Sequence, residues 1–406
     1  MDKIETSEAT QTQTGAGRSA RLLTYLLFFL FAITTDAVGV IIPEVIAEFD
    51  LTLTQASGFH YMTMLAIALS GIGLGFLSDR YGRKRTILLG MGLFSAATLG
   101  FVASTQYALF MALIFVMGLA IGIFKTGALA LVGDVSSNPH DHTRTMNLAE
   151  GFFGVGAIAG PAIVTYMISQ DVHWTWLYGV TGVSCLFILL FVLRQTFPDY
   201  TPARESNAGL QSTLKKVKDP YVLGFSTAIA LYVVTEAAIY VWMPTYLLGY
   251  DGQFELVAAY ALTTFFIFRA AGRFIGAWIL HTLPWKLVLT VFSGGIALCY
   301  TGAVVLGVNA AAWILPLSGI FMSVMYPTIN SKGISCFAPS EHGAVAGIIL
   351  FFTAVAAAGG PLVMALLGDA FGNVAYGFYF TLACAVLLFI LAILNQLFDP
   401  AGERVD

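Results

Sequence analysis

Long apolar runs constrain this chain of 406 residues more than any other feature. A helix of about 20 residues crosses the hydrocarbon core of a bilayer, which is roughly 30 Å thick. Because 58% of the residues are hydrophobic and only 10% are charged, we expect lipid to be the solvent. Membrane strands would alternate polar and apolar residues, so continuous runs predict an all-α membrane protein. Its twelve transmembrane helices are expected at residues 22–43, 57–77, 86–104, 108–132, 145–168, 174–194, 221–248, 256–280, 285–307, 310–334, 343–367 and 374–397.

The polar stretch at residues 195–219 separates the first six runs from the last six. It holds Pro198, Pro202, Gly209 and a cluster of lysines, as expected of a linker. Residues 1–20 are polar and contain no apolar stretch, which is typical of a disordered cytoplasmic tail and not of a signal peptide. We therefore predict a tail at 1–20, a six-helix bundle at 21–194, a cytoplasmic linker at 195–219, a second bundle at 220–397 and a tail at 398–406.

A repeat with an offset of 200 residues relates the two halves. It aligns Thr35-Asp36-Ala37 with Thr235-Glu236-Ala237, and Gly160-Pro161 with Gly360-Pro361. A repeat of this kind predicts two pseudo-symmetric bundles, as in transporters built from duplicated halves. The paired Gly-Pro sequences indicate positions where helices pack closely.

The distribution of basic residues predicts the orientation. Cytoplasmic loops carry an excess of Lys and Arg. With the N-terminus inside, 16 of the 19 Lys and Arg residues fall in or beside cytoplasmic segments, and none falls in an external loop. We expect both termini to be cytoplasmic, in a multi-pass protein of the cell (inner) membrane. The other three bases, Lys125, Arg269 and Lys332, lie inside apolar runs.

The sequence GFLSDRYGRKR at residues 75–85 resembles the signature loop of the major facilitator superfamily. The resemblance implies two six-helix bundles around a central cavity that opens to each side in turn. It also implies that the acid and bases of this loop contact neighbouring helix ends and latch the cytoplasmic face. Arg273, within Gly272–Gly276, is the counterpart in the second half. The gating residues expected on this basis are Gly75, Asp79, Arg80, Gly82, Arg83 and Arg273.

Helix 7 is similar to that of the fucose-galactose-glucose proton symporter group, in which an acid is followed six residues later by Trp, here Glu236 and Trp242. The resemblance implies proton-coupled sugar uptake, with Asp36 at the position of a helix 1 acid. Two departures matter. Lys125 stands where the fucose permease has an embedded Glu, and Phe153 replaces an Asn. A lysine in the cavity favours an anionic substrate or an internal carboxylate partner.

The embedded bases each leave two interpretations open. Lys125 and Glu150 lie at matching depths, so Lys125 either pairs with Glu150 or contacts substrate. Arg269 either binds an anionic ligand group bidentately or pairs with Glu236 in a neighbouring helix. Lys332 is close enough to the cytoplasm to extend its ammonium to the interface.

The embedded acids Asp36 and Glu236 are the candidates for proton coupling. Burial disfavours a charged carboxylate, so such a group can take up a proton on one side and release it on the other. Permanent pairing with Lys125 or Arg269 is the alternative. Polar and aromatic side chains near these charges complete the predicted substrate-binding set: Lys125, Arg269, Trp242, Tyr240, Tyr61, Phe153 and Glu150.

The motifs support neither enzymatic chemistry nor transport driven by ATP hydrolysis. The sequence contains no Walker loop, metal-ligand spacing or nucleophile elbow, and its four cysteines form no CxxC pair. We therefore predict a monomeric transporter without cofactor, metal or nucleic acid, whose partners are a small solute, protons and membrane lipid. The expected function is proton-coupled uptake of a sugar, sugar acid or other organic anion. Proton-driven efflux, uniport, Na⁺ coupling and a non-transporting sensor remain alternatives.

Overall fold

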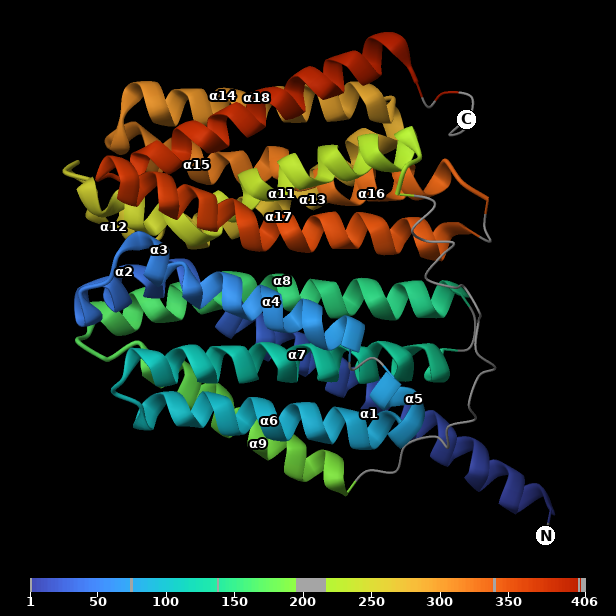
Figure 1. The fold of residues 1–406 in the computed structure, drawn as a ribbon. Coiled ribbons are helices and arrows are strands. Elements are labelled where there is room, and N and C mark those ends of the chain that lie inside the picture. Colours follow the sequence, from blue (N-terminus) through green and yellow to red (C-terminus); the bar gives the residue numbers. More distant parts are fainter. Residues whose placement is uncertain are drawn as a thin grey trace. The chain divides into compact units, whose positions relative to one another are not determined.

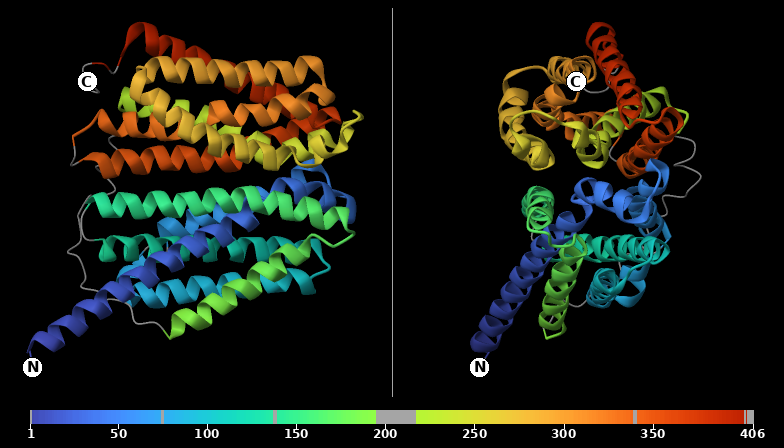
Figure 2. Two further views of the ribbon diagram at one scale, coloured as in Figure 1. Left: turned by 180° about the vertical axis from the view of Figure 1, so that it is seen from behind. Right: turned by 90° about the vertical axis from the view of Figure 1, so that its left-hand side faces the viewer.

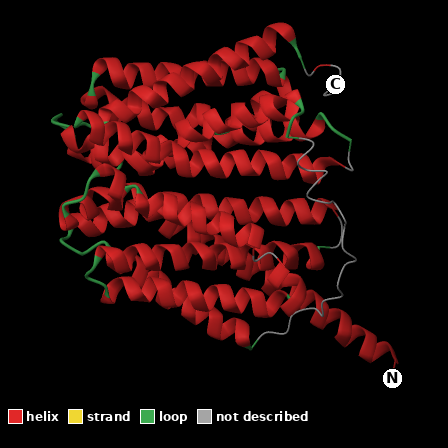
Figure 3. Ribbon diagram, viewed as in Figure 1, coloured by secondary structure: helices red, strands yellow, loops and turns green. Residues whose placement is uncertain are grey.

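The described part of the chain is entirely helical. The computed structural model describes residues 2–73, 76–136, 139–194, 217–338, 341–400 and 402, and these contain no strand (Figure 3). Eleven helices among them are long and apolar enough to cross a membrane. The remaining predicted run, at 57–77, contains α4 (Gly58–Gly73), a helix of 16 residues, which makes twelve spans plausible. The all-α prediction is confirmed.

The first compact unit contains residues 1–37 and 62–204. Within it α6 packs against both α7 and α9, while α1 packs against α8 (Figure 1). Helix α1 begins at Asp2, so the structure differs from the disordered tail expected over residues 1–20. The helices of this unit are α1 (Asp2–Thr35), most of α4, α5 (Phe76–Tyr81), α6 (Arg83–Ala103), α7 (Tyr107–Val135), α8 (Pro139–Ser169) and α9 (Thr175–Leu193).

The second unit contains residues 38–61 and 205–406. Helix α11 contacts α2, α13, α16, α17 and α18. In Figure 2 it is the yellow-green helix among the orange and red helices of this unit. The predicted linker lies outside the described residues except at 217–219. The helices are α2 (Val38–Phe49), α3 (Leu53–Ala56), α11 (Pro220–Tyr246), a 3₁₀ turn (Leu247–Gly249), α12 (Glu255–Ala259), α13 (Ala261–Thr282), α14 (Trp285–Leu306), α15 (Val308–Met322), α16 (Met325–Ser335), α17 (His342–Phe371) and α18 (Ala375–Phe398).

Residues 38–61 depart from the predicted division into bundles at 21–194 and 220–397, because they pack with the second unit. Gly39 makes this packing close: a Cβ at that position would lie 2.1 Å from the Tyr240 carbonyl oxygen. At the start of α3, the backbone N–H groups of Leu53 and Thr54 each donate to the Asp369 carboxylate at 2.8 Å. A carboxylate is favourable there because the first N–H groups of a helix have no intrahelical acceptor.

The repeated Gly-Pro sequences lie at equivalent helix contacts in the two units. A Cβ on Gly160 of α8 would lie 2.4 Å from the Ile33 carbonyl oxygen of α1, and one on Gly156 would lie 2.4 Å from that of Phe29. In the second unit, a Cβ on Gly360 of α17 would meet Val234 of α11 at 3.0 Å. Small residues let membrane helices approach closely. The packing interpretation of these sequences is thereby confirmed.

Gly160→Leu is expected to destabilise the protein, because the new side chain would collide with the α1 backbone, which cannot move aside as a side chain can. Overpacking of this kind costs about 1 to 3 kcal/mol or more. Gly154→Leu in the same helix is the matched control, since a Cβ there meets nothing within 4 Å. The thermal unfolding midpoint in detergent should fall for the first variant only; an equal fall in both would contradict the α1–α8 contact.

Candidate functional site

Asp36 lies at a break in the first membrane-spanning segment. Helix α1 ends at Thr35 and α2 begins at Val38, so Asp36 and Ala37 form a turn inside the span Gly17–Phe49. The Thr35 hydroxyl lies 2.9 Å from Asp36 Oδ2 and 3.0 Å from the Phe31 carbonyl oxygen, and it donates to one of them at a time. The carboxylate is half-buried. A broken helix at membrane depth exposes backbone dipoles beside an ionisable group, which is typical of ion and substrate sites in transporters.

Lys125 of α7 is held between two aromatic rings in the first unit. Its Nζ lies 5.5 Å from the ring centroid of Phe28 and 5.3 Å from that of Phe153. These are cation–π distances. Glu150 is exposed, and in the described part of the chain no ion pair forms between it and Lys125. Of the two interpretations of Lys125, the structure therefore contradicts the Glu150 salt bridge.

Arg269 of α13 pairs with Glu236 of α11. Its Nη2 lies 2.5 Å from Glu236 Oε1, and the two side chains are 22% and 10% exposed. The Tyr232 hydroxyl lies 2.9 Å from the same carboxylate oxygen and 2.9 Å from the Met322 carbonyl oxygen. A hydroxyl has one proton, so Tyr232 donates to only one of these acceptors at a time. The internal pairing of Arg269, one of the two predicted alternatives, is the one that forms.

Helix α15 positions the cluster formed by Glu236, Arg269 and Tyr232. A Cβ on Gly319 of α15 would lie 2.5 Å from the Phe265 carbonyl oxygen and 3.0 Å from the Arg269 nitrogen, so glycine brings α15 against the Arg269 backbone. Helix α15 then ends at Met322, where its carbonyl has no helical donor and meets Tyr232 instead. The cluster thus spans three helices of the second unit.

Trp242 is fully buried, and its indole N–H donates to the Pro361 carbonyl at 2.9 Å. In this arrangement the side chain joins α11 to α17 and has no free polar atom for a solute. Tyr240 and Tyr61 are both half-buried. The Tyr240 ring packs edge-on against His60, with centroids 5.4 Å apart.

His60 and Tyr232 are polar groups that no sequence motif marks as functional. Pro361 has no backbone N–H, which leaves the Ala357 carbonyl one turn earlier without its helical donor. His60 Nε2 lies 2.9 Å from that oxygen and supplies the missing donor. A proline inside an apolar run is the available signal that some donor is needed, but it does not say which. Tyr232 lies one turn before Glu236, a spacing that places both on one helix face.

The signature loop is tied to the end of α7 by Arg83. Its Nε donates to Asp134 Oδ2 at 2.9 Å, and its Nη1 donates to the Ser78 hydroxyl at 2.9 Å. Gly82 precedes the helix with φ of 85°, in the left-handed region that favours glycine. Its carbonyl accepts from the Thr86 amide at 3.2 Å, which starts α6. These contacts join the loop to the end of α7 and to α5.

The other predicted gating residues either are exposed or lie outside the described part of the chain. Arg80 is exposed and lies 5.5 Å from the Tyr81 ring. Arg273 is exposed on α13. Gly75 lies outside the described residues, as does the side chain of Asp79. In the described part of the chain no group of three or more His, Cys, Asp or Glu is placed to hold a metal ion.

Comparison with known proteins identifies the family. The model of the Major Facilitator Superfamily matches residues 24–361. The chain belongs to the major facilitator superfamily. Its members are transporters, so the protein is a multi-pass membrane transporter and not an enzyme.

Individual relatives in this superfamily are distant. The TsgA homolog of Enterobacter sp. (strain 638) is 25% identical over 321 residues, which cover 77% of this chain and 79% of the relative. The Escherichia coli fucose:proton symporter FucP has a TM-score of 0.62 at 20% identity, covering 93% of this chain and 98% of that structure. A mutant of peptide transporter POT in complex with alafosfalin has a TM-score of 0.77 at 14% identity, covering 97% and 99%. At these identities the structures share the fold.

Proposed function

We propose that this transporter takes up a small organic anion, such as a sugar acid, together with a proton across the cell (inner) membrane. A neutral sugar is the second candidate, favoured by the similarity to FucP, which is a fucose:proton symporter. Two pseudo-symmetric six-helix bundles with cytoplasmic termini would alternate around a central site. Asp79, Arg80, Arg83 and Arg273 would act at the cytoplasmic gate.

The environment of Lys125 carries the proposal. Arg269 is already neutralised by Glu236, whereas the Lys125 ammonium faces two aromatic rings and, among the described residues, has no carboxylate within ion-pair distance. A charge inside a membrane protein is costly unless something compensates it. Cation–π contacts supply from about 0.5 kcal/mol at exposed sites to about 2 kcal/mol when desolvated, and they leave the net charge of the ammonium in place. An anionic solute would complete this site, with Phe28 and Phe153 covering its apolar face.

Asp36 is the proposed proton carrier. It lies at a helix break in the same unit as Lys125, where a change of conformation alters its surroundings without disrupting a continuous helix. In the proposed cycle Asp36 takes up a proton from the outer side and passes it to the cytoplasmic side. Glu236 is assigned a supporting role, because its carboxylate already holds Arg269.

The charge carried per cycle tests the proposal. One monoanion moving with one proton transfers no net charge, whereas a neutral sugar moving with a proton transfers one positive charge. In proteoliposomes, a pH gradient should therefore drive accumulation of the anion, and an added membrane potential should change the initial rate little. Matched pairs of a neutral sugar and its acid, such as D-galactose and D-galacturonate, would be compared first by thermal shift and then by flux.

Lys125→Met should weaken binding of the anion and leave binding of its neutral analogue unchanged. A hydrogen bond to a charged group contributes about 1.5 to 3 kcal/mol, so the KM for the anion should rise roughly tenfold to 150-fold. Lys125→Arg, which keeps the positive charge, is the matched control and should retain most of the affinity.

Three results would contradict the proposal. If only neutral sugars stabilise the protein and Lys125→Met has no effect, an anionic substrate is excluded and symport of a neutral sugar remains. Acidification of lightly buffered medium on adding solute to cells would indicate antiport and hence efflux, since symport should make the medium more alkaline. Solute binding without flux under an imposed pH gradient would indicate a sensor.

A further inference from the structure

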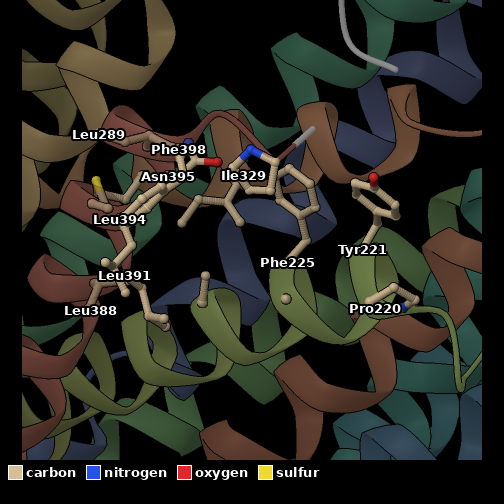
Figure 4. A pocket seen from close by; sticks show the side chains of 15 residues that line it. Pro220, Tyr221, Phe225, Leu289, Ile329, Leu388, Leu391, Leu394, Asn395 and Phe398 are labelled. Carbon is tan, nitrogen blue, oxygen red and sulfur yellow. The ribbon is translucent and has the colours of Figure 1, made fainter. Parts of the chain in front are cut away.

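An apolar groove of about 580 Å³ lies in the second unit at one end of the membrane-spanning helices. It is lined by residues at the start of α11 and the end of α18, with α14 and α16 behind them (Figure 4). Of its fifteen lining residues, only Tyr221 and Asn395 carry a polar side-chain atom. Its volume falls within the range of about 300 to 1,000 Å³ that is usual for small-molecule sites.

The sequence leaves this groove open through small residues on α11. Gly224 and Ala228 are one turn apart and line the groove, and a Cβ on Gly224 would meet nothing within 4 Å. The opposite edge is formed by Leu394 and Phe398 of α18, which are 42% and 74% exposed. Because these helices are candidate membrane spans, we expect side chains exposed along them to face lipid. An unfilled groove would forfeit the dispersion contacts of its walls.

Basic side chains surround the end of the groove where α11 begins. Lys218 lies two residues before the lining residue Pro220, Lys286 lies three before Leu289, and Lys332 lies three after Ile329. The ammonium groups of Lys286 and Lys332 lie 5.7 and 5.5 Å from the ring centroid of Trp285, so both are gathered around one indole.

Two acids moderate this charge. Lys286 pairs with Asp399, and Asp219 caps α11 by accepting the Tyr221 amide at 2.9 Å. Among the described residues, three lysines against two acids leave the rim net positive. The opposite end of α11 leads to Asp251 and Glu255, with no Lys or Arg between residues 220 and 268. By the positive-inside rule, the groove faces the cytoplasmic leaflet, where anionic lipids carry the surface charge.

We propose that this groove is a binding site for an anionic phospholipid, with one acyl chain between α11 and α18 and the headgroup phosphate at Lys332, which among the described residues has no carboxylate within ion-pair distance. The acyl chain restores the missing wall contacts but gives little selectivity, since lipid tails are as apolar as the leucines beside them. Selectivity comes from the lysines, each of which changes the preference for an anionic headgroup roughly fivefold. The site is independent of the proposed substrate site, because it lies outside the Lys125 and Glu236 clusters.

Native mass spectrometry of the full chain in a neutral detergent tests this site, with phosphatidylglycerol and phosphatidylcholine of identical acyl chains as the probes. The wild type should bind one phosphatidylglycerol at least fivefold more tightly than phosphatidylcholine. Lys332→Gln should reduce this preference without affecting phosphatidylcholine. Gly224→Phe should fill the groove and weaken binding of both lipids, and Gly224→Ala, the matched control, should not.

Equal binding of the two lipids by the wild type would overturn the proposal. So would phosphatidylglycerol binding that is unchanged in both Lys332→Gln and Gly224→Phe, because the lipid would then sit elsewhere. Gel filtration checks that each variant is folded. Should Gly224→Phe aggregate, the headgroup preference of Lys332→Gln decides alone, since this side chain lies at the rim and not in the helix packing.

Discussion

Asp36→Asn should abolish accumulation of solute against its gradient and leave exchange of solute across the membrane intact. Asparagine is close in shape to a protonated aspartic acid, so the loaded carrier should still change conformation. It cannot release a proton, so a pH gradient can no longer be converted into a solute gradient. The measurements are uptake driven by a pH gradient and counterflow at equal pH in proteoliposomes. We expect the first to fall to the level of empty liposomes and the second to stay within about threefold of wild type, a change under 1 kcal/mol.

Two variants isolate the role of the proton in this experiment. Asp36→Glu keeps an ionisable group at the helix break and should retain part of the accumulation. Glu236→Gln removes the other embedded carboxylate, and proton-driven accumulation by the folded fraction should survive. Accumulation by Asp36→Asn at the wild-type level would show that the coupling group is elsewhere.

The sequence predicts most of the fold because lipid imposes simple constraints. A helix must be long enough to cross the hydrocarbon and must satisfy its own backbone, so the apolar runs locate the spans closely. The run expected at 285–307, for example, corresponds to α14 at Trp285–Leu306. The repeat adds packing information, since Gly160 and Gly360 mark equivalent close contacts. Local sequence is sufficient to locate both the spans and these two packing positions.

The site depends on contacts that local composition does not encode. Hydropathy runs smoothly through Asp36, so the break between α1 and α2 was not predicted, although the polar sequence Thr34-Thr35-Asp36 is a weak signal for it. Residues 38–61 were assigned to the first bundle because they precede the linker, yet Gly39 and Asp369 bind them into the second unit. The Arg269–Glu236 pair depends on how α13 and α11 are aligned along their lengths. The sequence alone does not give this alignment.

The two aligned acids have different surroundings and hence different proposed roles. Asp36 lies in a turn, half-buried, with the Thr35 hydroxyl as a neighbour. Glu236 lies inside the continuous helix α11, pairs with Arg269, and shares the Tyr232 hydroxyl with the Met322 carbonyl. Glu236 is committed to its contact with a guanidinium, whereas Asp36 lies at a helix break where a change of conformation can alter its surroundings. Aligned positions of the 200-residue repeat thus carry acids that differ in their contacts.

The Glu236–Arg269 pair should behave as a structural unit in a double-mutant cycle. Removing one partner of a buried ion pair costs about 3 to 5 kcal/mol, because the other charge loses its compensation. Since Arg269 is 22% exposed, we expect the lower end of that range. Glu236→Gln and Arg269→Gln should each lower the unfolding midpoint, and the double variant should recover much of the loss, with a coupling energy of about 1 to 3 kcal/mol.

Denaturation in detergent measures stability in this cycle, and counterflow per folded molecule measures function. Tyr232→Phe is the matched control: it keeps the ring and both charges, and removes only the hydroxyl shared by Glu236 and Met322, so its cost should stay near 1 kcal/mol. Additive losses in the double variant would show that the pair does not stabilise the second unit. Normal stability in Arg269→Gln with a large loss of solute affinity would instead assign Arg269 to the ligand, and the anion would then have two candidate cations.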